Sequence, residues 1–152
     1  MKLKKLLTLG LSLLLILPLL SLAQTSPESF LGHKVGADRK LADYNQITAY
    51  FKKLDQESPK IKVVEIGRST LGKPIIMAII TSEENMAQLD KFKSIARRLR
   101  DARGLSEEEA RQLAREGKAI VLITCNIHST EIGSAQMSME FAYNLVTGRT
   151  PL

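Results

Sequence analysis

The chain has 152 residues, of which 44% are hydrophobic and 25% are charged, and its formal net charge is +6. These proportions are ordinary for a globular domain and exclude a disordered or fibrous chain. Only 5% of the residues are aromatic, so the stacking side chains used to bind single-stranded nucleic acid are scarce. We therefore expect one compact domain and no nucleic-acid partner.

The first 23 residues have the pattern of a secretory signal peptide. Three lysines at the start precede an apolar run from Leu6 to Leu20, and the small residues Ser21 and Ala23 stand where a signal peptidase cuts. The run is too short to span a bilayer, which takes roughly 20 apolar residues. We expect a cleaved signal over residues 1–23, secretion or export to the periplasm, and no stable membrane insertion. Loss of the three lysines lowers the net charge to +3, so the basic charge carries little functional meaning.

Residues 24–40 combine proline, glycine and polar residues without periodicity, which predicts an irregular lead-in to the domain. A helix is predicted from Asp43 onward and should end at Ser58 and Pro59. Its apolar residues recur at helical spacing and are Ile47, Tyr50, Phe51 and Leu54.

A β-hairpin is predicted next. Apolar and charged residues alternate over residues 61–66, and the segment from Gly67 to Pro74 has the composition of a turn, so residues 75–81 can run back beside the first strand. The second strand is an unbroken apolar run from Ile75 to Ile80, which predicts burial on both faces.

A long helical excursion follows the hairpin. Residues 82–103 predict one helix with Ser82 as its N-cap and a single apolar stripe. Ser106 and Glu109 have the spacing of a capping box that starts a second helix, and Gly117 ends it.

Residues 119–125 are the strongest strand candidate in the chain, and we expect this strand to be central. A helix is predicted over residues 132–146. The order of helix, two strands, helical excursion, strand and helix predicts an α/β sandwich with a mixed sheet. Cys125 is the only cysteine, so no intrachain disulfide can form, and we expect a buried free thiol there rather than a metal or redox role.

The polar segment between this strand and the last helix is the candidate site. Ligands bind at the carboxyl ends of strands in open α/β sheets. His128 is followed three residues later by Glu131, and both residue types bind zinc if the backbone turns between them. The spacing is common by chance, so a purely structural histidine remains an alternative. The hydroxyl groups available to hold such ligands belong to Ser129, Thr130 and Ser134.

Two runs of residues carry a family resemblance. The run Asn126-Ile127-His128-Ser129-Thr130-Glu131-Ile132-Gly133 resembles the first zinc-binding motif of the zinc carboxypeptidase (metallocarboxypeptidase) family. The segment from Ile66 to Ile75 is similar to the hairpin signature of that family, a glycine-containing turn between its first two strands. The similarity implies a three-layer α/β/α sandwich with a mixed sheet.

The resemblance also implies a function and a cofactor. In the family, residues matching His128 and Glu131 bind Zn2+ together with a second histidine far downstream, and the enzyme hydrolyses peptide bonds in a peptide or protein substrate. No catalytic residue is assigned in this chain, because the family's general base and its carboxylate-binding arginines are expected downstream of Leu152. Residues 41–152 are thus expected to be the N-terminal part of the catalytic domain, truncated after the first zinc motif and inactive alone. His33 matches no ligand position of the family.

Two departures from the family pattern leave alternatives open. Thr130 stands where well-known members have an arginine that helps to polarise the substrate carbonyl. The helical excursion over residues 82–117 is longer than the connection in small members and is interpreted as a subgroup insertion. A zinc amidase or deacylase of the same fold, or a non-catalytic exported binding module, are the alternative functions.

Overall fold

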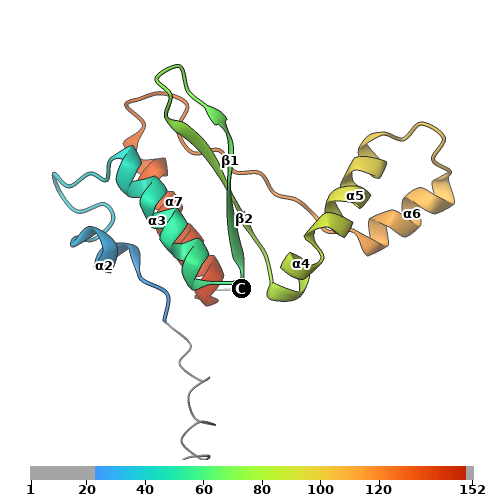
Figure 1. The fold of residues 1–152 in the computed structure, drawn as a ribbon, viewed down its shortest axis with the longest axis horizontal. Helices are drawn as coiled ribbons and strands as arrows, with labels where there is room; N and C mark the ends of the chain where they lie inside the picture. Colours follow the sequence, from blue (N-terminus) through green and yellow to red (C-terminus); the bar gives the residue numbers. More distant parts are fainter. Residues whose placement is uncertain (1–22, 150–152) are drawn as a thin grey trace, which may run out of the picture.

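The computed structural model describes residues 23–149, so all but the last residue of the expected signal lies outside the described part. The elements in chain order are α2 (Pro27–Leu31), α3 (Tyr44–Glu57), β1 (Ile61–Arg68), β2 (Pro74–Ile80), α4 (Glu83–Ala87), α5 (Leu89–Arg100), α6 (Glu107–Glu116) and α7 (Ile132–Thr147). Figure 1 shows two regions: α2, α3 and α7 gather beside the hairpin, whereas α5 and α6 lie at the opposite end of the molecule. Among the described residues, no helix is both long and apolar enough to cross a membrane.

The first long helix starts as its sequence predicts. The side chain of Asp43 accepts a hydrogen bond from the Gln46 amide, and the Gln46 side chain accepts one from the Asp43 amide, each at 2.9 Å. This reciprocal capping box fixes the first turn of α3. The lead-in is not wholly irregular, because Ser26 caps a short helix, α2, with Pro27 in its first turn.

The predicted hairpin is confirmed. Strands β1 and β2 pair in antiparallel register from Ile61 opposite Ile80 to Arg68 opposite Pro74, with a bulge between Glu65 and Gly67. Gly72 has a φ of 72°, a left-handed conformation that glycine adopts without steric cost, and it lies in the tight turn between the strands.

The core lies between the hairpin and two helices, α3 and α7, which pack against one face of the two-stranded sheet (Figure 1). The buried apolar side chains of this cluster are Ile47, Tyr50, Phe51, Leu54, Ile61, Met139, Ala142, Tyr143 and Val146. Alternate residues of β2, namely Ile76, Ala78 and Ile80, pack onto it. The prediction that β2 is buried on both faces is wrong, because the strand is only half-buried and Ile75 is exposed.

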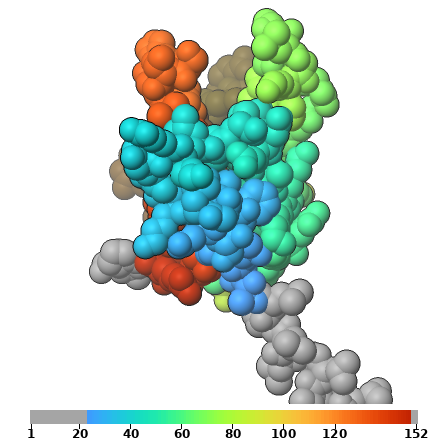
Figure 2. Space-filling model, turned by 90° about the vertical axis from the view of Figure 1, so that its left-hand side faces the viewer, coloured from blue at the N-terminus to red at the C-terminus, as the bar shows by residue number. Residues whose placement is uncertain are grey.

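The lead-in is attached to α3 by polar contacts. The Thr25 amide and hydroxyl both donate hydrogen bonds of 2.8 Å to the Glu57 carboxylate, which also forms an ion pair with Lys53. The buried Tyr50 hydroxyl donates to the Thr25 carbonyl, and burial, helped by nearby Tyr143 and Glu57, raises the Tyr50 pKa. In Figure 2 the lead-in, coloured blue, covers this side of the packed helices.

The predicted helix over residues 82–103 is divided in two. Gln88, with φ −110° and ψ 18°, ends α4 and precedes α5. The second helix of the excursion is confirmed: Ser106 accepts the Glu109 amide at 3.2 Å, and Gly117 is the C-cap of α6. Helices α5 and α6 pack on each other and bury only Ile95.

The predicted central strand over residues 119–125 is not formed. The segment is extended but unpaired in the described structure, and it runs from α6 back toward α7 (Figure 1). Its side chains are exposed: Ile120 74%, Val121 81%, Leu122 76% and Ile123 53%. A strand needs a partner for its backbone groups, and the paired sheet in residues 23–149 contains only β1 and β2. Over residues 23–149 the structure is therefore mixed α/β, without the mixed sheet or the third layer expected from the sequence. Cys125, expected to be buried, is a half-buried free thiol.

Candidate metal-binding site

A tight turn between the extended segment and α7 brings His128 and Glu131 together. The Glu131 amide donates a hydrogen bond of 3.1 Å to the His128 carbonyl, which closes the turn. The next residue, Ile132, is the first of α7. The two residues predicted as zinc ligands are therefore placed on one turn at the start of a helix.

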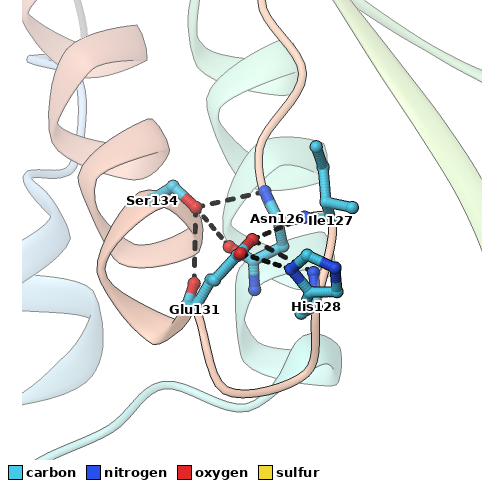
Figure 3. Close-up of polar contacts among 5 residues, drawn as sticks. All are labelled: Asn126, Ile127, His128, Glu131 and Ser134. Atoms are coloured by element: carbon cyan, nitrogen blue, oxygen red, sulfur yellow. Dashed lines mark hydrogen bonds and ion pairs between the residues drawn. The ribbon is translucent and has the colours of Figure 1, made fainter.

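The two side chains converge in space (Figure 3). The Nδ1 atom of His128 lies 2.5 Å from the Oε1 atom of Glu131. The other carboxylate oxygen, Oε2, accepts hydrogen bonds from the backbone amides of Ile127 at 2.9 Å and His128 at 3.0 Å. One oxygen of Glu131 is thus fixed by the backbone, and the other faces the imidazole ring.

This environment favours the ionised form of Glu131. The hydrogen bond from the His128 side chain, followed by those from the His128 and Ile127 amides, lowers the Glu131 pKa. Glu131 is the N-cap residue of α7, but its carboxylate bonds the loop amides and no amide of the helix. A metal ligand must be deprotonated, and the two backbone hydrogen bonds, which metal binding need not break, favour that form of Glu131.

The donor set fits two of the protein ligands of a zinc site. Zinc takes imidazole nitrogen and carboxylate oxygen at about 2.0–2.2 Å, so two such ligands on one ion stand roughly 3–3.5 Å apart. The observed 2.5 Å is a hydrogen-bond distance, and binding would require the heads to separate by about 1 Å. The His128 side chain, which is 73% exposed, can make that movement while Glu131, 45% exposed, keeps the backbone hydrogen bonds of its other oxygen.

A third ligand does not join the pair within residues 23–149. No group of three His, Cys, Asp or Glu residues that could hold a metal ion occurs in this range. His33, the other histidine of the chain, has its Nδ1 atom 3.1 Å from the Lys34 carbonyl oxygen.

Polar contacts from α7 hold the loop that carries the pair. Ser134, expected among the supporting hydroxyl groups, accepts the Asn126 amide at 3.1 Å and also hydrogen-bonds the Asn126 side-chain oxygen (Figure 3). Ser129 and Thr130 make no side-chain hydrogen bond to the pair among the described residues. Asn126, which has a φ of 71°, has a role in this loop that was not predicted from the sequence. Its residue type was the available signal, because asparagine adopts the left-handed conformation more readily than most residues.

Comparison with known proteins identifies the family. The family model for zinc carboxypeptidases matches residues 47–151, about two thirds of the chain, and the chain belongs to this family. The match includes the hairpin, the helical excursion and the turn carrying His128 and Glu131. No curated protein and no solved structure matches the chain. The family is zinc-dependent and acts on peptides, which supports the predicted class of metallopeptidase.

Proposed function

We propose that this chain is the N-terminal part of the catalytic domain of an exported zinc-dependent carboxypeptidase, and that His128 and Glu131 are two of its metal ligands. The observation that carries the proposal is the convergence of His128 Nδ1 and Glu131 Oε1 in a chain of the zinc carboxypeptidase family. When bound, zinc would polarise the scissile carbonyl of a peptide and stabilise the charge that develops on it.

The residues of the chain have separate tasks in this proposal. His128 and Glu131 bind the cation, and the amides of Ile127 and His128 orient the Glu131 carboxylate. The turn closed between His128 and Glu131 sets the direction of both heads. The general base and the groups that bind the substrate carboxylate are expected outside residues 23–149, so we expect this chain alone to hydrolyse no peptide.

Metal binding by the chain tests the two ligands directly. Zinc affinity should be measured by competition with a chromophoric chelator for the wild type, His128→Ala and Glu131→Ala. Both variants should lose most of the affinity, because each removes one of two protein ligands. His33→Ala is the matched control and should bind as the wild type does. Equal affinity in all four proteins would remove the proposed role of the pair.

The proposal also includes the mixed sheet and the helical layers of the complete domain. We infer that residues 119–125 become a strand of a mixed sheet, with helices on both faces, in the complete domain. Its support is the run of four exposed apolar side chains in an extended segment, an arrangement suited to a strand covered on both sides.

An unpaired apolar segment of this kind promotes association between chains. The isolated chain should therefore aggregate, and Leu122→Lys should reduce aggregation in light scattering. Leu71→Lys adds the same charge at another exposed leucine, in the hairpin turn, and should help much less. A wild-type chain that remains monodisperse over the concentration range of the light-scattering measurement would contradict this account of the segment.

Export is proposed from the signal-like pattern of residues 1–23. The chain should be processed after Ala23 when it is produced in a bacterial host with a general secretion pathway. N-terminal sequencing of the periplasmic and cytoplasmic fractions measures this directly. Recovery of the unprocessed chain in the cytoplasm alone would contradict export.

A second function is favoured by one residue. Thr130, between the two proposed ligands, has no charge with which to polarise a substrate carbonyl as the arginine of well-known members does. An amidase or deacylase that uses the same zinc site is the alternative that this residue supports. Hydrolysis assays of the longest product of the locus on C-terminal peptide bonds and on side-chain amides would separate the two activities.

A further inference from the structure

The loop that carries His128 and Glu131 has little support from the segment before it. Residues 120–123, which precede the loop, are exposed and unpaired. The geometry of the loop must therefore be maintained by the loop itself and by α7, the element that follows it.

Ser134 connects both ends of this loop. Its hydroxyl oxygen accepts a hydrogen bond of 3.1 Å from the Asn126 amide, at the start of the loop. The same hydroxyl hydrogen-bonds the Asn126 side-chain oxygen, and it lies 3.4 Å from the Glu131 carbonyl oxygen at the end of the loop. A serine hydroxyl has one proton and two lone pairs, so donation to the nearer Asn126 oxygen and acceptance from the Asn126 amide are compatible.

Asn126 depends on this contact for its conformation. Its φ of 71° is in the left-handed region, which asparagine adopts more readily than most residues but still at a cost relative to the right-handed region. The two hydrogen bonds to Ser134 offset that cost and direct the following backbone toward the carboxylate of Glu131. The amides of Ile127 and His128 then reach Glu131 Oε2, which leaves Oε1 facing the imidazole ring.

We propose that Ser134 is a positioning residue of the metal site. Its hydroxyl hydrogen-bonds Asn126 and thereby holds the loop in the conformation in which His128 and Glu131 can bind one cation. The proposal rests on the proposed zinc site and goes beyond it, since Ser134 itself does not touch the metal. Hydrogen-bond partners that orient metal ligands commonly change metal affinity by tenfold to a hundredfold when removed. Removal of the Ser134 hydroxyl should act in this way, through the geometry of the loop.

The experiment compares zinc affinities of dilute protein by chelator competition. Ser134→Ala should bind zinc about tenfold or more weakly than the wild type. Ser134→Thr retains the hydroxyl and should restore the affinity, which a general effect on packing would not do. Ser138→Ala is the matched control, because Ser138 is a half-buried serine one turn later in α7 whose hydroxyl donates to the Ala135 carbonyl instead.

A variant of Asn126 tests the other partner of the hydrogen bonds made by Ser134. Asn126→Gly retains the amide and tolerates the left-handed conformation, but it removes the side-chain oxygen that contacts Ser134. We expect a smaller loss of affinity than for Ser134→Ala. The circular dichroism spectrum of every variant should match that of the wild type, since both residues lie outside the apolar core.

The outcomes separate this inference from the proposed function. Loss of zinc by His128→Ala and Glu131→Ala, together with wild-type affinity in Ser134→Ala, would overturn the role of Ser134 and leave the metal site standing. Equal weakness of Ser134→Thr and Ser134→Ala would also overturn it, because the hydroxyl would then not be the active group. Wild-type affinity in His128→Ala and Glu131→Ala would overturn the proposed site and the role of Ser134 with it.

Discussion

The two regions of the molecule are stabilised by different means. The packed region, formed by α2, α3, β1, β2 and α7, has a continuous apolar cluster of nine buried side chains. The helical pair, formed by α5 and α6, buries only Ile95 and is joined by two ion pairs between its helices, Lys91 with Glu116 and Arg98 with Glu109. Burial of apolar surface stabilises far more than exposed ion pairs do. The cooperative stability of the protein therefore belongs to the packed region, which also carries the candidate site at the start of α7.

The largest effect on stability is expected from a substitution in the core of the packed region. Leu54 is fully buried between the helices and the hairpin. Leu54→Ala should lower the free energy of unfolding by about 2–5 kcal/mol, because the substitution removes buried methyl groups and leaves a cavity. Urea unfolding followed by circular dichroism measures the change. Leu71→Ala, at a leucine that is 84% exposed, is the control and should change stability by less than about 0.5 kcal/mol.

A smaller and more local effect is expected at the end of α6. A Cβ atom at Gly117 would lie 3.0 Å from the Leu113 carbonyl oxygen and 3.1 Å from Cγ2 of Ile95, the one buried side chain of the helical pair. Gly117→Ala should destabilise that pair by about 1–3 kcal/mol. Hydrogen exchange should therefore accelerate in α5 and α6 and not in α3.

The control for that substitution is Gly133→Ala, whose Cβ would meet no atom within 4 Å. Because alanine favours the helix over glycine, this change should leave the structure intact or stabilise α7 by about 0.5–1 kcal/mol. Faster exchange throughout the chain in Gly117→Ala would contradict the independence of the two regions.

Substitution of Arg98 should have a still smaller effect on the stability of the helical pair. Its guanidinium group donates to the carbonyl oxygens of Asp101, Arg103 and Gly104, at 3.0–3.1 Å, and so holds the connection between α5 and α6. Arg98→Lys keeps the charge but lacks the planar fork, so protection of the α5–α6 amides should fall by about 1 kcal/mol. Arg97→Lys, one residue earlier on the same helix, should have no comparable effect.

The smallest effect is a pH dependence in the packed region. Burial alone would raise the Glu57 pKa, but hydrogen bonds from Lys53 and from the Thr25 amide and hydroxyl outweigh it and lower the pKa. A lowered folded pKa gives stability that is present above the ordinary value, near 4.5, and is lost as the pH falls through the folded value. Glu57→Gln should therefore flatten the decline of stability with acid below about pH 4.5.

Glu108→Gln, on the exposed face of α6, is the matched control for acid unfolding. It removes a carboxylate but none of the contacts to Thr25, so its acid profile should follow that of the wild type. The melting temperatures of the three proteins between pH 3 and 7 make the comparison. Parallel profiles for Glu57→Gln and the wild type would show that the Thr25 contacts contribute nothing.

The sequence predicts best where the signal is local. The start of α3 at Asp43, the hairpin turn within Gly67 to Pro74 and the start of α6 at Ser106 all depend on residues close in the chain, and all three are confirmed. Helix α2 also had a local signal, Ser26 followed by Pro27, which the irregular composition of the lead-in obscured. The break at Gln88 had no comparable residue to mark it, since glutamine is a good helix former.

Features that depend on distant partners were less predictable. Residues 119–125 have the composition of a buried strand, but strand formation requires a neighbour to accept its hydrogen bonds, and composition does not supply one. For the candidate site, the spacing of His128 and Glu131 predicted that the two heads could meet, and they do. The hydrogen bond between Ser134 and Asn126 was predicted only in part, because nothing in the sequence favoured one of three nearby hydroxyl groups over the others. The left-handed backbone at Asn126 places its amide against Ser134.

The contacts of Thr25 set a practical boundary for recombinant versions of the protein. A version that starts at Ser26 would lose two hydrogen bonds to Glu57 and leave the buried Tyr50 hydroxyl without its acceptor. A tag joined before Gln24 removes none of these groups. Purification tags are therefore best fused upstream of Gln24. A protease site for removal of the tag should cut after Ala23 or earlier.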